Sequence, residues 1–313
     1  GSEMCIRESA CRSSLVLSPL SVLGFISGIG LKLVDFLSWA WWSSKSSSEI
    51  LKALINDNHE IVGVISQPDK RSRRSKGLEP SHVSAVAEAS SIKVYKPFKL
   101  DEDFKEKILS LDFDLLLVVA YGKILPKWLL ESSTKMSVNI HFSLLPKYRG
   151  ASPIQSALFN NDGLTGISVM KMTEGLDEGP VFISHKLKIL DSDNRKSLEQ
   201  KLTSLCIENI EDDLNNIFEG KLAPMDQNED NASYCKKIDK LSGKISFKDE
   251  KTDAILRKYK AYFGWPGLYF EKNNLMIKIH GITVDCENNE ILKDSDYIFN
   301  NTGLKVKTMD SYI

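Results

Sequence analysis

The stretch SVNIHFSLLPKYRGASPIQSAL, residues 137–158, combines a short strand pattern with an unusual density of polar and cationic side chains. Its first residues alternate between apolar and polar types, which predicts a strand over 137–142. Asn139 and His141 are two positions apart on this strand, so their side chains point to the same face. An ordinary core strand has no need of an amide beside an imidazole, so the pair suggests a functional site.

Helical and strand patterns alternate around this stretch. Helices are predicted over 46–58, 81–92 and 101–112, and strands over 61–66, 92–97, 114–122 and 166–172. The run 114–122 is almost continuously apolar, as is typical of a strand buried on both faces of a parallel sheet. The alternation predicts a doubly wound, mostly parallel α/β sheet. Ligands bind outside the carboxyl ends of the strands in such sheets, which is where Asn139 and His141 fall.

The pattern changes after residue 220. Before it, Ser152, Pro153 and Gln155 predict a capped helix start, and 197–220 reads as a long amphipathic helix that Gly220 ends. The polar stretch 221–238 predicts a linker. Beyond it, short strand patterns predict a small β-barrel; they cover 244–248, 267–272, 276–285 and 303–309.

The composition narrows the classes of protein to which this chain can belong. The 313 residues are enough for two domains, and the formal net charge of −1 provides no whole-chain attraction for nucleic acid or membrane. The five cysteines are odd in number, widely spaced and form no C-x-x-C motif, which favours reduced thiols in a cytoplasmic protein over disulfides or zinc. No metal-ligand spacing is present, so no metal is expected.

The N-terminal part is strongly apolar over residues 14–43. A signal peptide or membrane anchor has this character, but Pro19, Lys32 and Asp35 interrupt the run and no small-residue cleavage site follows. A buried strand–helix start and a non-native extension are the alternatives. Residues 1–40 are interpreted as an atypical N-terminal extension, and no membrane partner is expected.

Asn139, His141 and Asp177 together suit acyl transfer to an amine. A histidine exchanges protons near neutral pH, a nearby carboxylate fixes its tautomer, and an amide N–H stabilises a developing oxyanion. No Ser or Cys is placed as an obvious nucleophile, so direct attack by the amine is favoured over a covalent intermediate. The plain alternative is that His141 is a hydrogen-bonded strand residue and Asp177 a turn residue.

A basic run follows the strand predicted over 61–66. It places five cations within seven residues: Lys70, Arg71, Arg73, Arg74 and Lys76. A polyphosphate backbone is the natural partner of such a cluster. A solvated surface loop is the alternative.

The motifs NIHFSLLPKYRGASPIQ (139–155) and GLDEGP (175–180) resemble the signature of the 10-formyltetrahydrofolate-dependent formyltransferases. Four further segments are similar to the members that formylate methionyl-initiator tRNA. These are IVGVISQPDK (61–70), LLLVVAYGKILPKWLL (115–130), YCKKIDKLSGKISF (234–247) and YKAYFGWPG (259–267). The resemblance runs from about residue 46 to about residue 310.

The resemblance implies a Rossmann-like catalytic domain over 41–220, a linker over 221–238 and a C-terminal OB-like tRNA-binding barrel over 239–313. It implies transfer of the formyl group of 10-formyltetrahydrofolate directly to the α-amine of methionyl-initiator tRNA. A monomer is expected, although the residues leave the oligomeric state open. The resemblance implies that Asn139, His141 and Asp177 are the catalytic residues and that the basic run binds tRNA. The residues that it implies for folate binding are Ser143, Leu144, Leu145, Pro146, Val119, Ala120, Tyr121 and Gly122.

The sequence departs from the family pattern at three places. Where the family has a Gly-Thr-Pro-like turn, residues 38–51 read SWAWWSSKSSSEIL, without Gly or Pro. Phe142 replaces a usually small residue, and alternation directs its ring to the opposite face, into the core. The sequence ends at residue 313, before the last strand and helix expected of the barrel.

Three rival functions share parts of this pattern. A related formyltransferase could act on a nucleotide-sugar or ribonucleotide amine, and a folate hydrolase could use water as the acceptor. Neither the related formyltransferase nor the folate hydrolase would need the basic run. The segment YKAYFGWPG is a further argument against the related formyltransferase. A catalytically impaired RNA-binding relative would have no need to keep Asn139, His141 and Asp177 together.

Overall fold

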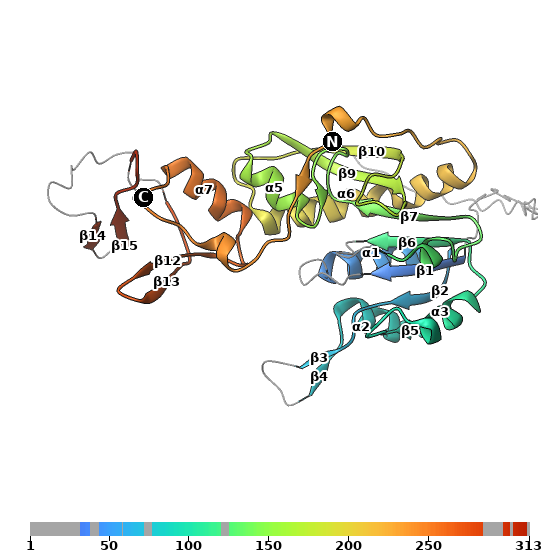
Figure 1. Ribbon diagram of the computed structural model, residues 1–313. Coiled ribbons are helices and arrows are strands. Elements are labelled where there is room, and N and C mark those ends of the chain that lie inside the picture. Colours follow the sequence, from blue (N-terminus) through green and yellow to red (C-terminus); the bar gives the residue numbers. More distant parts are fainter. Residues whose placement is uncertain are drawn as a thin grey trace, which may run out of the picture.

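The computed structural model describes residues 32–37, 44–57, 59–71, 77–119, 125–283, 297–300 and 303–311. In this part of the chain, seven strands form one sheet with the order β10-β9-β7-β6-β1-β2-β5 (Figure 1). The strands β1, β2, β5, β6 and β7 run parallel, whereas β9 is antiparallel to β7 and β10 to β9. The predicted, mostly parallel α/β sheet is confirmed. The strand bounds are β1 Lys32–Leu37, β2 Glu60–Ile65, β5 Val94–Tyr95, β6 Leu115–Val119, β7 Met136–His141, β9 Leu164–Lys171 and β10 Val181–Lys188.

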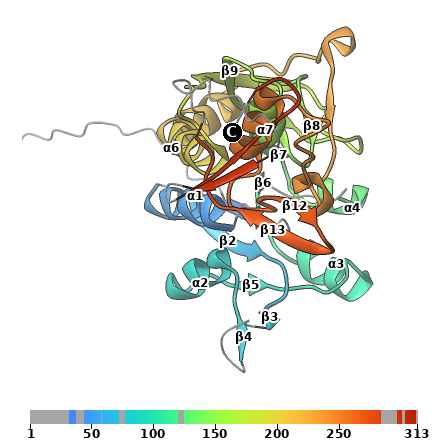
Figure 2. The ribbon, with the colours of Figure 1, turned by 90° about the vertical axis from the view of Figure 1, so that its left-hand side faces the viewer.

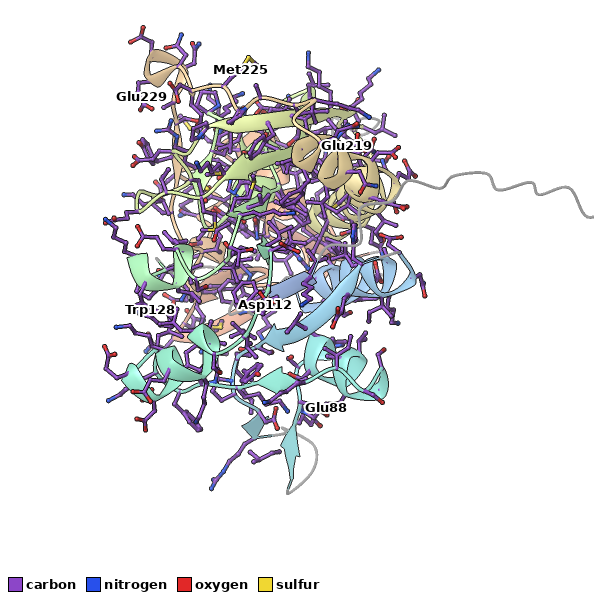
Figure 3. All side chains as sticks on the ribbon, turned by 90° about the vertical axis from the view of Figure 1, so that its right-hand side faces the viewer. Glu88, Asp112, Trp128, Glu219, Met225 and Glu229 are labelled. Carbon is purple, nitrogen blue, oxygen red and sulfur yellow. The ribbon has the colours of Figure 1, made fainter. Side chains whose placement is uncertain are left out.

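Helices cover both faces of this sheet. One face packs against α1 (Ser44–Asn56), α2 (His82–Ala89), α5 (Pro153–Phe159) and α6 (Arg195–Phe218). The other packs against α3 (Glu102–Leu109) and α4 (Lys127–Leu130), which carries Trp128 (Figure 3). The Trp128 ring lies edge-on against Phe104. Alternate residues of β6 enter the two cores, which explains why its sequence shows no polar alternation. None of the helices in the described ranges is long and apolar enough to cross a membrane.

Strand β1 lies in the middle of the sheet, between β6 and β2. Leu33 pairs with Leu115 and packs into one core, and Val34 faces the other core. Residues 32–37 therefore belong to the sheet, in contrast to their assignment to an N-terminal extension. The glycine-free turn predicted after this strand falls largely on residues outside the described ranges.

The start of α5 follows the prediction in part. Pro153 is its first residue, but the side chain of Ser152 makes no capping hydrogen bond to it. The Ser152 hydroxyl donates instead to the carbonyl of Lys236, at 2.6 Å. The predicted capping box with Gln155 is wrong, because the Ser152 hydroxyl is directed to Lys236 and the Ser152 N–H donates to Sγ of Cys235 instead of to Gln155. Phe142 is 8% exposed and lies in the apolar core, as alternation predicts.

The stretch predicted as a linker is hydrogen-bonded to the segment that follows β7. Its strand β11 (Tyr234–Cys235) pairs in parallel with β8 (Arg149–Gly150). The amide of Ser233 donates to the carbonyl of Pro146, and the amide of Arg149 donates to the carbonyl of Ser233. This stretch therefore packs against the loop that follows β7.

The C-terminal part is β-rich, as expected. In the described residues it contains α7 (Thr252–Ala261) and two antiparallel hairpins, which are β12–β13 (Leu268–Lys272 and Leu275–Ile279) and β14–β15 (Tyr297–Asn300 and Gly303–Val306). Helix α7, which the strand patterns did not suggest, packs against α5 through the stacked rings of Phe159 and Tyr262. Figure 2 shows this part in front of the carboxyl ends of the parallel strands.

Candidate active site

Strand β7 presents Asn139 and His141 at its carboxyl end. The strand lies between β6 and β9, where Asn139 pairs with Val118 and Met170, and His141 pairs with Ser168. Each of the two residues is 6% exposed. A strand held on both sides fixes where these two polar side chains point.

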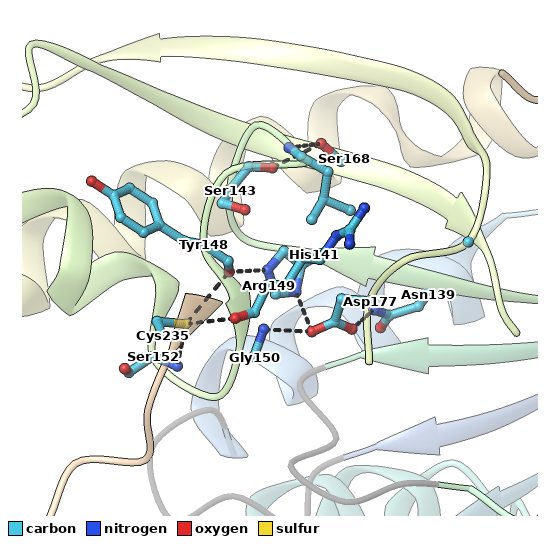
Figure 4. Close-up of polar contacts among 12 residues, drawn as sticks. Asn139, His141, Ser143, Tyr148, Arg149, Gly150, Ser152, Ser168, Asp177 and Cys235 are labelled. Carbon is cyan, nitrogen blue, oxygen red and sulfur yellow. Dashed lines mark hydrogen bonds and ion pairs between the residues drawn. The ribbon is translucent and has the colours of Figure 1, made fainter. Parts of the chain in front are cut away.

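Asp177 comes from the loop that joins β9 to β10. Its backbone has φ +51, a left-handed value that is uncommon for a residue other than glycine. Its Oδ2 accepts the N–H of Gly150 at 2.8 Å and lies 3.6 Å from Nδ1 of His141 (Figure 4). Asn139 Nδ2 donates to Oδ1 at 3.4 Å. The structure thus brings the three predicted catalytic residues together.

The hydrogen bond between His141 and the Tyr148 carbonyl defines the tautomer of the imidazole. Nε2 lies 2.9 Å from the carbonyl oxygen of Tyr148, which can only accept, so Nε2 carries the hydrogen. The neutral ring therefore has its lone pair on Nδ1, the nitrogen that faces Asp177. A proton accepted at Nδ1 comes to lie beside the carboxylate, which stabilises the resulting positive charge.

Asn139 keeps donor capacity for a ligand. Its contact with Asp177 is long for a hydrogen bond, and the amide carries a second N–H. An amide donor at the end of β7, beside the imidazole, can stabilise a negative oxygen that develops there.

Position 150 requires a glycine, both because its backbone has a positive φ and because no space is left for a Cβ atom. Its φ is +114, and a Cβ at this position would lie 2.4 Å from the carbonyl oxygen of Cys235. Only glycine therefore lets β11 approach β8 this closely while the Gly150 N–H points at Asp177.

Comparison with known proteins identifies the group to which this site belongs. The family model described as formyl transferase matches residues 42–209, and that described as formyl transferase, C-terminal domain, matches residues 237–313. The chain belongs to the formyltransferase family. The family predicted from the motifs around His141 is confirmed.

Curated relatives of this formyltransferase carry a more specific name. The methionyl-tRNA formyltransferase of Pelagibacter ubique is 41% identical over 223 residues, which cover 71% of this chain and 72% of the relative. That of a Nitratiruptor species is 40% identical over 255 residues, which cover 80% and 82%.

Solved structures share the fold of this formyltransferase. The N-formyltransferase from Helicobacter canadensis, in complex with folinic acid and dTDP-3-aminofucose, superposes with a TM-score of 0.64 at 19% identity. The match covers 91% of this chain and 97% of that one. At this identity the likeness concerns the fold.

The residues that the resemblance assigns to folate follow β7 in the formyltransferase. Ser143 is fully buried and its hydroxyl donates to the carbonyl of Lys147, so it shapes the loop. Ser168 of β9 donates to the Ser143 carbonyl and accepts from the Leu145 amide, which ties the loop to the sheet. Leu144 packs over Gly166, and Leu145 and Pro146 are joined by a cis peptide bond.

The second predicted folate segment is described only at its start. Val119 ends β6 and its side chain is fully buried in the core. The assignments to Ala120, Tyr121 and Gly122 lie outside the described residues.

The basic run occupies a hairpin at the edge of the domain. Lys70 and Arg71 form β3 and pair with β4 (Leu78–Glu79), and both are exposed. In Figure 1 this hairpin extends away from the sheet. The assignments to Arg73, Arg74 and Lys76 lie outside the described residues.

Sequence reasoning gave no role to several groups that complete the site. The Tyr148 carbonyl and the Gly150 N–H orient His141 and Asp177. Arg149 between them is fully buried. The local signal is the run PKYRG (146–150), separated from the end of β7 by four residues, in which a cation and a glycine are adjacent. In the described ranges, no group of three or more His, Cys, Asp or Glu side chains is arranged to hold a metal ion.

Proposed function

We propose that this chain transfers the formyl group of 10-formyltetrahydrofolate to the α-amine of methionyl-initiator tRNA. The observation that carries the proposal is the placement of His141 Nδ1 beside Asp177, with Asn139 next to both, at the carboxyl end of β7. The names of the curated relatives at about 40% identity support this choice of acceptor.

The transfer proceeds by direct attack. The amine nitrogen attacks the formyl carbon, and His141 Nδ1 takes the proton that the amine loses. The Asn139 N–H donates to the negative oxygen of the tetrahedral intermediate, while Asp177 stabilises the imidazolium. The bond from carbon to the folate nitrogen then breaks, and the imidazolium returns its proton to that nitrogen. The products are formylmethionyl-tRNA and tetrahydrofolate.

The folate co-substrate lies against the loop that follows β7. Leu144, Leu145 and Pro146 supply apolar surface there, which suits a flat pteridine ring, and the Ser143 hydroxyl closes the loop around them by donating to the Lys147 carbonyl. Val119 ends the neighbouring strand, and Ala120, Tyr121 and Gly122 continue it in sequence. The folinic acid in the Helicobacter canadensis enzyme supports a folate ligand for this fold.

The tRNA binds to two parts of the chain. Lys70, Arg71, Arg73, Arg74 and Lys76 contact phosphates of the acceptor end, since arginine and lysine neutralise a polyphosphate backbone. Residues 239–313 form the second tRNA-binding surface. The chain acts as a monomer in the cytosol, and its five widely spaced cysteines, which form no C-x-x-C motif, suit a reducing compartment.

A transfer assay with a labelled formyl donor tests this function. Methionyl-initiator tRNA, free methionine, a nucleotide amino sugar and glycinamide ribonucleotide are offered separately, with deacylated tRNA as the control. Label is expected on methionyl-tRNA alone. Preferred labelling of the sugar or the ribonucleotide would refute the acceptor, and transfer to none of them would refute the activity.

A further inference from the structure

Arg149 is a fully buried cation whose side-chain partners all come from the segment between the two domains. Its Nε donates to Gln227 at 3.0 Å, and its two terminal nitrogens donate to the two carboxylate oxygens of Glu229 at 2.9 and 2.7 Å. The hydroxyl of Tyr234 accepts a further bond at 3.1 Å. The hydrogen bond to Glu229 raises the pKa of Arg149 above its ordinary value. A buried charge needs such partners, so Arg149 fixes this segment in place.

Gln227 connects Arg149 to the loop that carries Asp177. Its Nε2 donates to the backbone carbonyls of Asp177 and Gly179, at 2.9 and 2.7 Å, while its Oε1 accepts from Arg149. The amide orientation is defined, because a flipped group would put its oxygen against two carbonyls and its N–H groups against a guanidinium. Every polar atom of this side chain is therefore used to join β8 to the loop.

The Asp177 loop needs such support. Its left-handed backbone is a costly conformation that persists only where the surroundings determine it. Gly150 holds the Asp177 side chain, and Gln227 holds the backbone of the same residue. A backbone bridge between Met225 and Val181 attaches the same segment to the start of β10. Figure 3 shows Met225 and Glu229 together at one end of the molecule, beyond β9 and β10.

We infer that Arg149 and Gln227 are positioning residues that hold Asp177 against His141, so that the segment between the two domains takes part in catalysis. Arg149 fixes the orientation of the Gln227 amide, and this amide fixes the position of the Asp177 backbone. The backbone position in turn determines the distance from the Asp177 carboxylate to His141 Nδ1. The inference rests on the proposed function for its kinetic test.

The test changes the polar atoms of Gln227 in two ways. Gln227→Glu keeps an oxygen for Arg149 but sets a carboxylate against two carbonyls, and Gln227→Met removes the polar atoms at similar size. We expect each to lower kcat at least tenfold, with the KM of both substrates and the unfolding midpoint little changed. Asp226→Asn, an exposed neighbour, is the matched control and is expected to keep full activity.

A double-variant cycle separates positioning from a general structural effect. In an Asp177→Asn background, Gln227→Met is expected to lower kcat by less than a further twofold, because residues that act as a unit are not additive. A full tenfold further loss, or an unchanged kcat in both single variants, would overturn the inference.

A readout independent of activity is hydrogen exchange at the Gly150 amide, which donates to Asp177. Gln227→Met is expected to speed this exchange at least tenfold, and unchanged exchange would count against the inference. If the wild-type chain transfers no formyl group, the proposed function fails, but this measurement still tests the contact.

Discussion

Oδ2 of Asp177 lies 3.6 Å from Nδ1 of His141, on a ring whose other nitrogen donates to the Tyr148 carbonyl. The imidazole is thereby held between a neutral acceptor and a carboxylate. In the proposed transfer, a proton taken up at Nδ1 stays beside a negative charge, which favours its removal from an attacking amine. The same carboxylate oxygen is fixed by the Gly150 N–H, so the arrangement depends on backbone groups as much as on side chains.

Asp177→Asn tests the carboxylate. An amide of the same size can still accept from Gly150 but cannot stabilise the imidazolium, so we expect kcat to fall by about 10²-fold or more with little change in folding stability. Steady-state kinetics and urea unfolding measure the two effects. A kcat within twofold of wild type would show that the carboxylate has no catalytic role.

Gly150→Ala tests the close approach of β11. Its Cβ would lie 2.4 Å from the Cys235 carbonyl, in a left-handed conformation, so we expect a loss of about 1–3 kcal/mol in the free energy of unfolding and a lower kcat. Gly163→Ala is the matched control, because an added Cβ there meets no atom within 4 Å. Equal unfolding free energies for the two variants would contradict the steric argument.

The strands next to the site could be predicted from local patterns. Every residue of β6 is buried, so its run without polar alternation indicated a central parallel strand, and the period of two placed Asn139 and His141 on one face. For β1 the sequence leaves a strand as one alternative among three, because KLVDFL lies within a longer apolar stretch, where a strand and a targeting segment look alike. Its pairing with β2 and β6 depends on distant residues.

The groups that orient the predicted catalytic residues could not be predicted. The Tyr148 carbonyl and the Gly150 N–H are backbone groups, which leave no signature in side-chain patterns. Gln227 is 50 positions from Asp177 and lies in a polar stretch that has the composition of a linker. Its role follows only from the hydrogen bonds that the fold creates.

Asp193→Asn tests an acidic group at the start of α6. Burial alone would raise the pKa of Asp193, but hydrogen bonds from Lys201, the Leu190 amide and Ser197 hold it below its ordinary value. A depressed folded-state pKa gives stability that is present above the unfolded pKa of about 3.9 and is lost as the pH falls through the folded value. We expect the variant to lose about 1–3 kcal/mol of unfolding free energy at pH 7.

The same variant should approach wild-type stability as the pH falls below about 4, because the native carboxyl is then protonated too. Asp191→Asn, an exposed neighbour, serves as the control and is expected to have little effect at either pH. A stability difference independent of pH would rule out the linkage.

Replacing Arg73 and Arg74 by Gln tests the basic run. We expect the KM for methionyl-tRNA to rise at least tenfold and the KM for the folate to stay unchanged. The slope of log affinity against log salt should fall by about 0.7–0.9 for each lost phosphate contact. Replacing two exposed lysines outside the basic run, Lys107 in α3 and Lys135 directly before β7, is the control. An unchanged salt slope would argue against phosphate contacts.

The most direct test is the single-turnover rate of formyl transfer by His141→Ala, at saturating donor and methionyl-tRNA. His185→Gln, which changes a strand histidine paired with Asp213 outside the site, is the matched control. The predicted result is a rate at least about 10²-fold below wild type for His141→Ala, with tRNA binding retained and His185→Gln close to wild type. A rate equal to wild type in His141→Ala would contradict the assignment of proton transfer to this imidazole.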